Sequence, residues 1–258
     1  VPTNYDVTFD DVSFSYNNDH IHALKNISFS VPENTTTALV GPSGAGKSTI
    51  ARLIPRFWDI NKGSIRIGGV DIRDMDTNVL MDTVSFVFQD TFLFNDTLAG
   101  NIRIAKSDAT MDDIYNAAKA AQIHDFIMTL PNGYETMAGD RGANLSGGQK
   151  QRITIARAIL RNAPIIVLDE ATAFADPENE EEIVKALSNL MKQKTVIVIA
   201  HKLSTIKDVN QIVAFHNGEL TEAGTHDELL TLGGTYAGLW KNYTLAQNWD
   251  VHHKGGVL

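Results

Sequence analysis

The stretch that most constrains the fold is GPSGAGKST, residues 41–49. It fits the pattern G-x-x-x-x-G-K-[ST] with Gly41, Gly46, Lys47 and Ser48. The apolar run TALVG before it is typical of a strand, and a helical pattern begins at Lys47. In this strand–loop–helix context the pattern forms a phosphate-binding loop. We therefore expect the chain to bind the phosphate tail of a nucleotide.

Each residue type in this loop has a physical reason. Gly44 and Gly46 let the backbone curl so that successive N–H groups point at an anion, and the start of the helix adds positive potential. Lys47 is expected to reach the outer phosphates, and the hydroxyl of Ser48 is expected to coordinate Mg²⁺. The alternative is a glycine-rich turn with a surface lysine, which the flanking strand and helix disfavour.

Composition limits the remaining possibilities. With 258 residues, 43% of them hydrophobic, the chain can form one large domain or two small ones. The net charge of −9 disfavours a nucleic-acid binder held by a general positive field. No run of about 18 apolar residues occurs, so we expect no membrane span in this sequence. Because the sequence opens with VPTNYDVTF and no methionine, we interpret it as part of a longer protein.

Short apolar runs alternate with helical patterns, which predicts an α/β fold with a parallel sheet. Strands are expected at 7–16, 27–31, 37–41, 83–88, 165–169 and 195–200, with hairpins at 63–72 and 211–224. Helical patterns run from Lys47 to about 58 and dominate about 97–160. A later helix is expected to carry Ile183, Leu187 and Leu190 on one face, and the tail is expected to form a surface helix.

Two acids follow the apolar run IIVL. Asp169 and Glu170 then lie at the carboxyl end of a buried strand, the edge at which parallel sheets present ligand sites. Downstream of a phosphate loop, Asp169 is expected to hold Mg²⁺ and Glu170 to take a proton from the attacking water. A single acid could simply cap the next helix, but two adjacent acids favour catalysis.

A third motif makes the pattern specific. LSGGQ, residues 145–149, precedes the strand acids by about 20 residues. In this order and spacing, the phosphate loop, LSGGQ and LDE resemble the nucleotide-binding domain of ATP-binding cassette (ABC) transporters over nearly the whole chain. The segment 135–149 resembles the exporter-type arrangement, in which it contacts the membrane domain. The resemblance implies a P-loop NTPase (RecA-like) core, with an antiparallel β subdomain at the N-terminus and an inserted α-helical subdomain.

The resemblance also implies ATP and Mg²⁺ as cofactors and a head-to-tail dimer. The signature of one copy would then cover the ATP held by the phosphate loop of the other. The residues implied to contact nucleotide are Gly41, Ser43, Gly44, Gly46, Lys47, Ser48 and Thr49 in the loop, and Ser146, Gly147, Gly148 and Gln149 in the signature. The glycine pair, at the start of a helix, leaves room for a partner's γ-phosphate.

Four further landmarks follow from the same resemblance. Tyr16 matches the aromatic residue that stacks on adenine, and Gln89 matches the glutamine that touches Mg²⁺ and the attacking water. His201 matches the histidine at the γ-phosphate, and Asp176 the aspartate after the catalytic acids. Before Asp176, Ala173-Phe174-Ala175 stands where the family usually has Ser-Ala-Leu, so any contact of the serine hydroxyl across the dimer is lost.

The expected organisation is a single ABC ATPase domain over 1–258. Residues 1–90 and 151–258 would form the catalytic core with the β subdomain, and 91–150 the helical signature subdomain. The resemblance implies a transmembrane domain, expected upstream, that holds the chain at the cytoplasmic face of the membrane, and a second nucleotide-binding domain, identical or related, as partner.

Two other functions are weighed against this one. A soluble cassette ATPase acting on DNA or ribosomes usually carries long coiled coils or two cassettes, which this sequence lacks. A regulatory ATP-binding switch without catalysis would have lost Lys47, Glu170 or His201, and all three are present.

Overall fold

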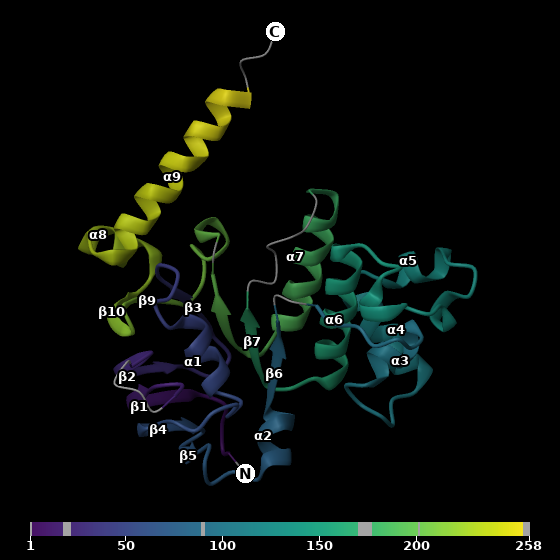
Figure 1. Cartoon of the computed structure of the whole chain (residues 1–258), viewed down its shortest axis with the longest axis horizontal. Helices are drawn as coiled ribbons and strands as arrows, with labels where there is room; N and C mark the ends of the chain where they lie inside the picture. The colour runs from purple at the N-terminus through teal and green to yellow at the C-terminus, as the bar shows by residue number, and fades with distance from the viewer. Residues whose placement is uncertain (1, 18–21, 89–90, 170–176, 201, 255–258) are drawn as a thin grey trace. The chain divides into compact units, whose positions relative to one another are not determined.

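The computed structural model describes residues 2–17, 22–88, 91–169, 177–200 and 202–254. The chain divides into two compact units, residues 1–75 with 197–258 (unit 1) and residues 76–196 (unit 2). Figure 1 colours the chain by residue number, so unit 1 combines the purple and blue start with the yellow-green end. Among the described residues, no helix has the length and apolar character that a membrane span requires.

Unit 1 begins with an antiparallel sheet in the order β2-β1-β4-β5. Its strands are β1 (Val7–Phe14), β2 (Leu24–Val31), β4 (Lys62–Ile67) and β5 (Val70–Asp71). In β1 the expected alternation is interrupted at Asp11, whose φ is 50°, where the register to both neighbours shifts. This β-bulge lets Phe9 and Val12, three positions apart, both lie buried. The hairpin expected at 63–72 is confirmed.

A second set of strands in unit 1 carries the phosphate loop. Strand β3 (Thr36–Val40) pairs in parallel with β9 (Gln211–His216), which pairs antiparallel with β10 (Glu219–Gly224). The expected turn between β9 and β10 is confirmed, with φ of 50° at Asn217 and 79° at Gly218. Helix α1 (Lys47–Leu53) follows β3 but ends earlier than its apolar pattern predicts. The reason is Pro55, because proline disfavours helical backbone in the residue before it.

Two helices close unit 1 at its C-terminal end: α8 (His226–Leu232), which the sequence pattern did not predict, and α9 (Thr235–Lys254). The tail was expected to be a surface helix, but Tyr236 in its first turn is fully buried. The buried carboxylate of Glu222 accepts a hydrogen bond from the backbone N–H of Tyr236 and so caps α9 from strand β10. The Tyr236 hydroxyl lies 2.7 Å from Nδ1 of His226. Helix α9 is thus anchored by its first turn.

Unit 2 pairs two parallel strands, β6 (Val84–Val87) and β7 (Ile165–Asp169). Its helices are α2 (Thr77–Thr83), α3 (Leu98–Arg103), α4 (Met111–Ala120), α5 (His124–Thr129), α6 (Gly147–Arg161) and α7 (Pro177–Met191), with 3₁₀ turns at Gly133–Glu135 and Asp140–Gly142. The expected apolar face of α7 is confirmed, since Ile183, Leu187 and Leu190 are buried. The helical patterns expected over about 97–160 are confirmed by helices α3 to α6.

Strand β8 (Thr195–Ile199) runs across the sequence boundary between the units. At its start, the N–H of Thr195 donates to the carbonyl of Pro164 in unit 2. Just after its end, the N–H of Ala200 donates to the carbonyl of Leu39 in unit 1. A short 3₁₀ turn, Leu203–Thr205, follows in unit 1. All the expected strands are present to within a few residues of the expected bounds.

The anchor of α9 predicts a difference between two tyrosines. Replacing Tyr236 with Phe removes a buried hydroxyl bonded to His226. Burial raises the pKa of this hydroxyl to about 12. We expect Tyr236→Phe to lower the free energy of unfolding by about 1 kcal/mol. Tyr243→Phe is the control, because its hydroxyl bonds an exposed Ser204 and should change stability by less than about 0.5 kcal/mol. Urea denaturation of both variants measures this; equal losses would contradict it.

Candidate functional site

The phosphate loop follows β3 and leads directly into α1, as its motif predicts. Gly44 and Gly46 have φ of 77° and 100°, a backbone conformation that side chains with a Cβ rarely adopt. A Cβ on Gly44 would meet nothing within 4 Å, so there the backbone angle alone requires glycine. No side chain caps the start of α1, at which Gly46 lies. The N-terminal end of the helix is therefore open to an anionic ligand rather than occupied by a capping hydroxyl or carboxylate.

The loop is also packed against backbone from two other parts of unit 1. A Cβ at Gly41 would collide with the carbonyl oxygen of Phe215 at the end of β9. A Cβ at Gly46 would lie 2.6 Å from Cδ2 of Leu24 and 3.0 Å from the carbonyl oxygen of Ala23, at the start of β2. We call this meeting of the loop, the start of β2 and the β9–β10 turn the loop junction.

The β9–β10 turn completes the loop junction through Gly218. Its N–H donates to the carbonyl of Ala45 at 3.3 Å, and its carbonyl accepts from the N–H of Lys25 at 2.8 Å. A Cβ at Gly218 would lie 2.6 Å from the carbonyl oxygen of Ala23. The sequence identified Gly218 only as a turn residue; its contact with the loop depends on tertiary pairing that no local pattern shows.

Lys47 is nearly buried within the loop. Its Nζ donates to the carbonyl of Gly41 at 2.7 Å and to that of Pro42 at 2.9 Å. These bonds hold the ammonium against the loop backbone. An ammonium held in place beside uncapped N–H groups suits a di- or triphosphate. Hydrogen bonds to a charged phosphate are stronger than those between neutral groups.

Tyr16 lies just after β1 and remains 44% exposed. Its hydroxyl is 2.8 Å from Oγ1 of Thr49, in the first turn of α1. Its ring meets Phe14 and Trp58 edge to face, with centroids 4.9 Å and 5.3 Å away. These contacts fix the ring next to the loop, and its exposed surface fits the predicted role as a stacking platform. Trp58 was not predicted as part of the site.

A pocket of about 320 Å³ is formed in unit 1 by these parts together. It is lined by Tyr16, Ala23 and the loop residues Ser43, Gly44, Ala45, Gly46, Lys47, Ser48 and Thr49. The structure therefore brings the predicted aromatic platform and the predicted phosphate ligands of unit 1, except Gly41, to one pocket. A nucleotide with its base at one end and its phosphates at the other matches this combination.

The signature motif begins α6 in unit 2. Ser146 is the N-cap: its Oγ accepts from the N–H of Gln149 at 3.3 Å, while Oε1 of Gln149 accepts from the N–H of Ser146 at 2.9 Å. This reciprocal capping box fixes the turn that holds Gly147 and Gly148. Ser146 and Gly147 are exposed and Gly148 is buried. The predicted helix N-terminus is confirmed, and the exposed side of the turn is accessible to another molecule.

The comparisons with known proteins address the family directly. The family model described as "ABC transporter" matches residues 24–173. The chain is 52% identical to the ATP-dependent lipid A-core flippase of Desulfotalea psychrophila, over 91% of this chain and 41% of the relative. It is also 52% identical to the mycobactin import ATP-binding/permease protein IrtA of Mycolicibacterium smegmatis, over 91% of this chain and 27% of the relative.

A solved structure gives the same answer. It is that of a bacterial Atm1-family ABC exporter with ATP bound, to which the chain is 44% identical. The TM-score is 0.88, and the match covers 94% of this chain and 42% of the other. The chain belongs to the ABC transporter family. It is the ATP-binding domain, of the kind that hydrolyses ATP, with the P-loop NTPase fold and the antiparallel N-terminal sheet expected. It spans less than half the length of each relative named here.

The ABC pattern assigns further positions that the structure describes only in part. Asp169 is buried at the end of β7, as predicted, on the last residue of the strand. Gln89, Glu170, Asp176 and His201 lie outside the described residues. Their roles, and that of Asp169 toward Mg²⁺, remain predictions from the sequence.

The loop junction of this ABC domain predicts unequal effects of two glycine substitutions. Gly218 and Gly69 both follow a turn position and both have φ of 79°, but a Cβ on Gly69 would meet nothing within 4 Å. Gly69→Ala should therefore cost only backbone strain, about 1 kcal/mol. Gly218→Ala adds the collision with Ala23, so we expect it to cost at least about 2 kcal/mol and to weaken ATP binding. Chemical denaturation and ATP titration measure both effects; equal behaviour of the two variants would show that the close approach is unimportant.

Proposed function

We propose that this chain hydrolyses ATP in head-to-tail pairs and drives a transmembrane domain through the closing and reopening of each pair. The observation that carries the proposal is the pocket of unit 1, where Tyr16, the glycine turns and Lys47 converge. The signature turn of unit 2 is the exposed start of α6. It supports the proposal of a second half-site, which would contact a nucleotide held by another copy. Pairing supplies each half-site with its complement.

The proposed division of labour follows the chemistry of each residue. Tyr16 stacks on the base, and the loop N–H groups with Lys47 bind the phosphates. Glu170 takes a proton from the attacking water, and His201 stabilises the charge that develops on the γ-phosphate. The signature residues of the partner exclude water and complete the binding of the γ-phosphate.

The oxygen donors present are the type that Mg²⁺ prefers: the Ser48 hydroxyl and the Asp169 carboxylate, together with the Gln89 amide oxygen. We propose that these residues hold Mg²⁺, with the assignment resting on the family resemblance. When bound, Mg²⁺ neutralises charge on the phosphates.

A transmembrane partner is supported by apolar side chains that unit 2 leaves exposed. Phe92 and Phe94 are 50% and 49% exposed and meet edge to face at 5.0 Å, and the guanidinium of Arg157 lies 6.0 Å from the Phe94 ring. Aromatic side chains are enriched in the surfaces through which proteins contact one another. We propose that this surface and the segment 135–149 meet the membrane domain, and that the chain lies at the cytoplasmic face.

We also propose that the whole chain is a single ATPase domain, in which residues 91–150 form the helical subdomain.

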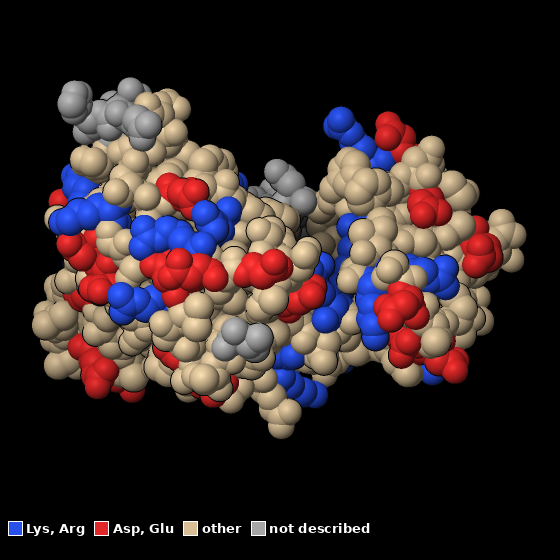
Figure 2. Space-filling model, turned by 90° about the horizontal axis from the view of Figure 1, so that it is seen from below, with Lys and Arg blue, Asp and Glu red and all other residues tan. Residues whose placement is uncertain are grey.

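The alternative of a cassette ATPase acting on DNA or ribosomes has no support from the relatives found. Figure 2 shows Lys and Arg groups lying among Asp and Glu groups on the face in view. In unit 1, Arg56 pairs with Asp59 and Arg73 pairs with Asp71, each at 2.6 Å. This mixing of charge signs differs from the one-sided basic field on which nucleic-acid binders depend.

Lys47→Ala tests the nucleotide site. The substitution removes the only ammonium that the loop places against the phosphate position, and charge-assisted hydrogen bonds are worth about 1.5–3 kcal/mol. We expect ATP to bind about 10- to 100-fold more weakly, measured by titration with a fluorescent ATP analogue. Unchanged binding would show that the loop is not the phosphate site.

Glu170→Gln tests the catalytic assignment. The amide keeps the size of the side chain but cannot accept the proton, so we expect hydrolysis to fall at least about 100-fold. ATP binding should persist, and the variant should form ATP-dependent dimers that a steady-state phosphate-release assay shows to be nearly inactive. Normal turnover would remove Glu170 from its proposed role.

A further inference from the structure

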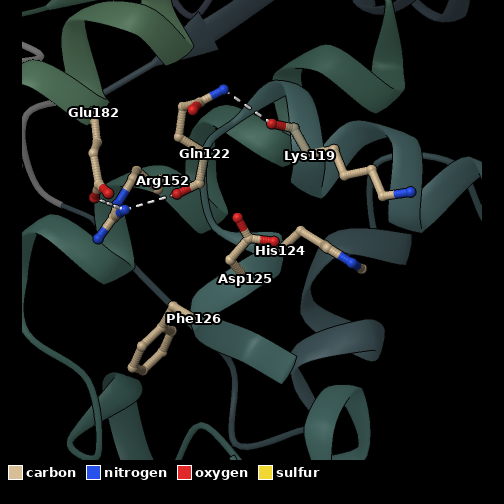
Figure 3. A pocket seen from close by; sticks show the side chains of 7 residues that line it. All are labelled: Lys119, Gln122, His124, Asp125, Phe126, Arg152 and Glu182. Carbon is tan, nitrogen blue, oxygen red and sulfur yellow. Dashed lines mark hydrogen bonds and ion pairs between the residues drawn. The ribbon is translucent and has the colours of Figure 1, made fainter. Parts of the chain in front are cut away.

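One turn into the signature helix α6, unit 2 buries an arginine that none of the assignments above uses. Arg152 is 4% exposed. Its Nε donates to the carbonyl of Gly148 at 3.4 Å, and its Nη1 donates to the carbonyl of Gln122 at 2.7 Å and to the carboxylate of Glu182. Figure 3 shows the guanidinium between Gln122 and Glu182. One side chain thus joins three segments of the unit.

The three segments have different roles. Gly148 belongs to the signature turn, Gln122 ends the corner between α4 and α5 with φ of 56°, and Glu182 lies on α7. Burying a guanidinium is costly unless its donors are satisfied, so these acceptors are tied to Arg152 as long as it stays buried. A shift of α7 would then move the guanidinium of Arg152, which also donates to the Gly148 carbonyl.

The position of Glu182 connects the signature turn to the segment that contains the predicted catalytic residues. Helix α7 begins at Pro177, immediately after the stretch that contains Glu170 and Asp176, and Glu182 lies in its second turn. The side chain of Glu182 is 47% exposed and borders a polar pocket of about 350 Å³. The Glu182 end of the pair can therefore be altered without opening the core, unlike the Arg152 end.

We propose that Arg152 and Glu182 are positioning residues that hold the signature turn 146–149 in the orientation in which it meets the nucleotide of the partner copy. The inference rests on the proposed head-to-tail function. It adds that the chain's own α7, which follows its catalytic segment, sets the orientation of the half-site it offers to its partner. Losing the pair should weaken ATP-driven closure and leave ATP binding at the chain's own loop unchanged.

The test compares neighbouring glutamates in the 258-residue chain carrying Glu170→Gln. Glu182→Ala and Glu182→Gln remove the charge facing Arg152. Glu181→Ala and Glu181→Gln are matched controls, since Glu181 is 76% exposed and pairs with Lys185 one turn along, at 2.8 Å. Sedimentation gives the Kd of self-association with ATP, a fluorescent ATP analogue gives nucleotide affinity at low protein concentration, and thermal unfolding gives Tm.

We expect Glu182→Ala to weaken ATP-driven self-association about fivefold, the effect of roughly one lost ion pair, and Glu182→Gln to have a smaller effect because its amide oxygen still accepts. Nucleotide affinity should stay within about twofold, and the Glu181 variants should match their parent.

The outcomes separate this inference from the proposed function. If the Glu170→Gln parent fails to self-associate with ATP, the proposed function fails and this inference fails with it. If the parent self-associates and the Glu182 and Glu181 variants do so equally, only the positioning role is overturned. A lower Tm for the Glu182 variants with unchanged self-association would assign the pair a purely structural role and would also overturn it.

Discussion

The close approach of the phosphate loop to two other segments, the start of β2 and the β9–β10 turn, is the constraint on which unit 1 depends. Gly41, Gly46 and Gly218 each occupy a place where a Cβ would meet backbone or side-chain atoms at 3.0 Å or less. The loop, the start of β2 and the β9–β10 turn therefore pack closely only because glycine stands at these three positions. Lys47 lines the pocket beside the loop, and Tyr16, two residues after β1, is joined to the same place through its hydrogen bond with Thr49.

The phosphate loop and the signature turn, the two proposed half-sites, begin their helices in different ways. The loop is left without a side-chain cap and holds its charge on Lys47, whereas the signature turn is closed by the Ser146–Gln149 capping box. The uncapped N–H groups at the start of α1 stay available to an anion, whereas the capping box satisfies two N–H groups of the signature turn. Burial of Arg152 beneath that turn adds rigidity. This asymmetry fits the proposed site shared between two copies.

Local chemistry made much of this predictable. The phosphate loop, LSGGQ and IIVLD have lengths, glycines and apolar runs that specify strand, turn and helix on their own, and all three are confirmed. Helix α8 was not predicted because its seven residues form a short, mostly polar pattern that owes its start to the Thr225–Glu228 capping box. The burial of Tyr236, the contact of Gly218 with the loop and the packing of Trp58 on Tyr16 arise from tertiary pairing, which periodicity along the sequence does not contain.

The central claim is that neither copy encloses its ATP alone, and mixing two damaged chains tests it most directly. In a Glu170→Gln background, one chain carries Lys47→Ala and the other carries Ser146→Arg, so that each fails to trap ATP by itself. The account predicts that mixing them yields dimers retaining one ATP per two chains, because one composite site is intact. Each damaged chain alone should retain none, because both composite sites of its homodimer then lack either the loop lysine or an intact signature. Retention of ATP by either damaged chain alone, or no retention in their mixture, would contradict the account.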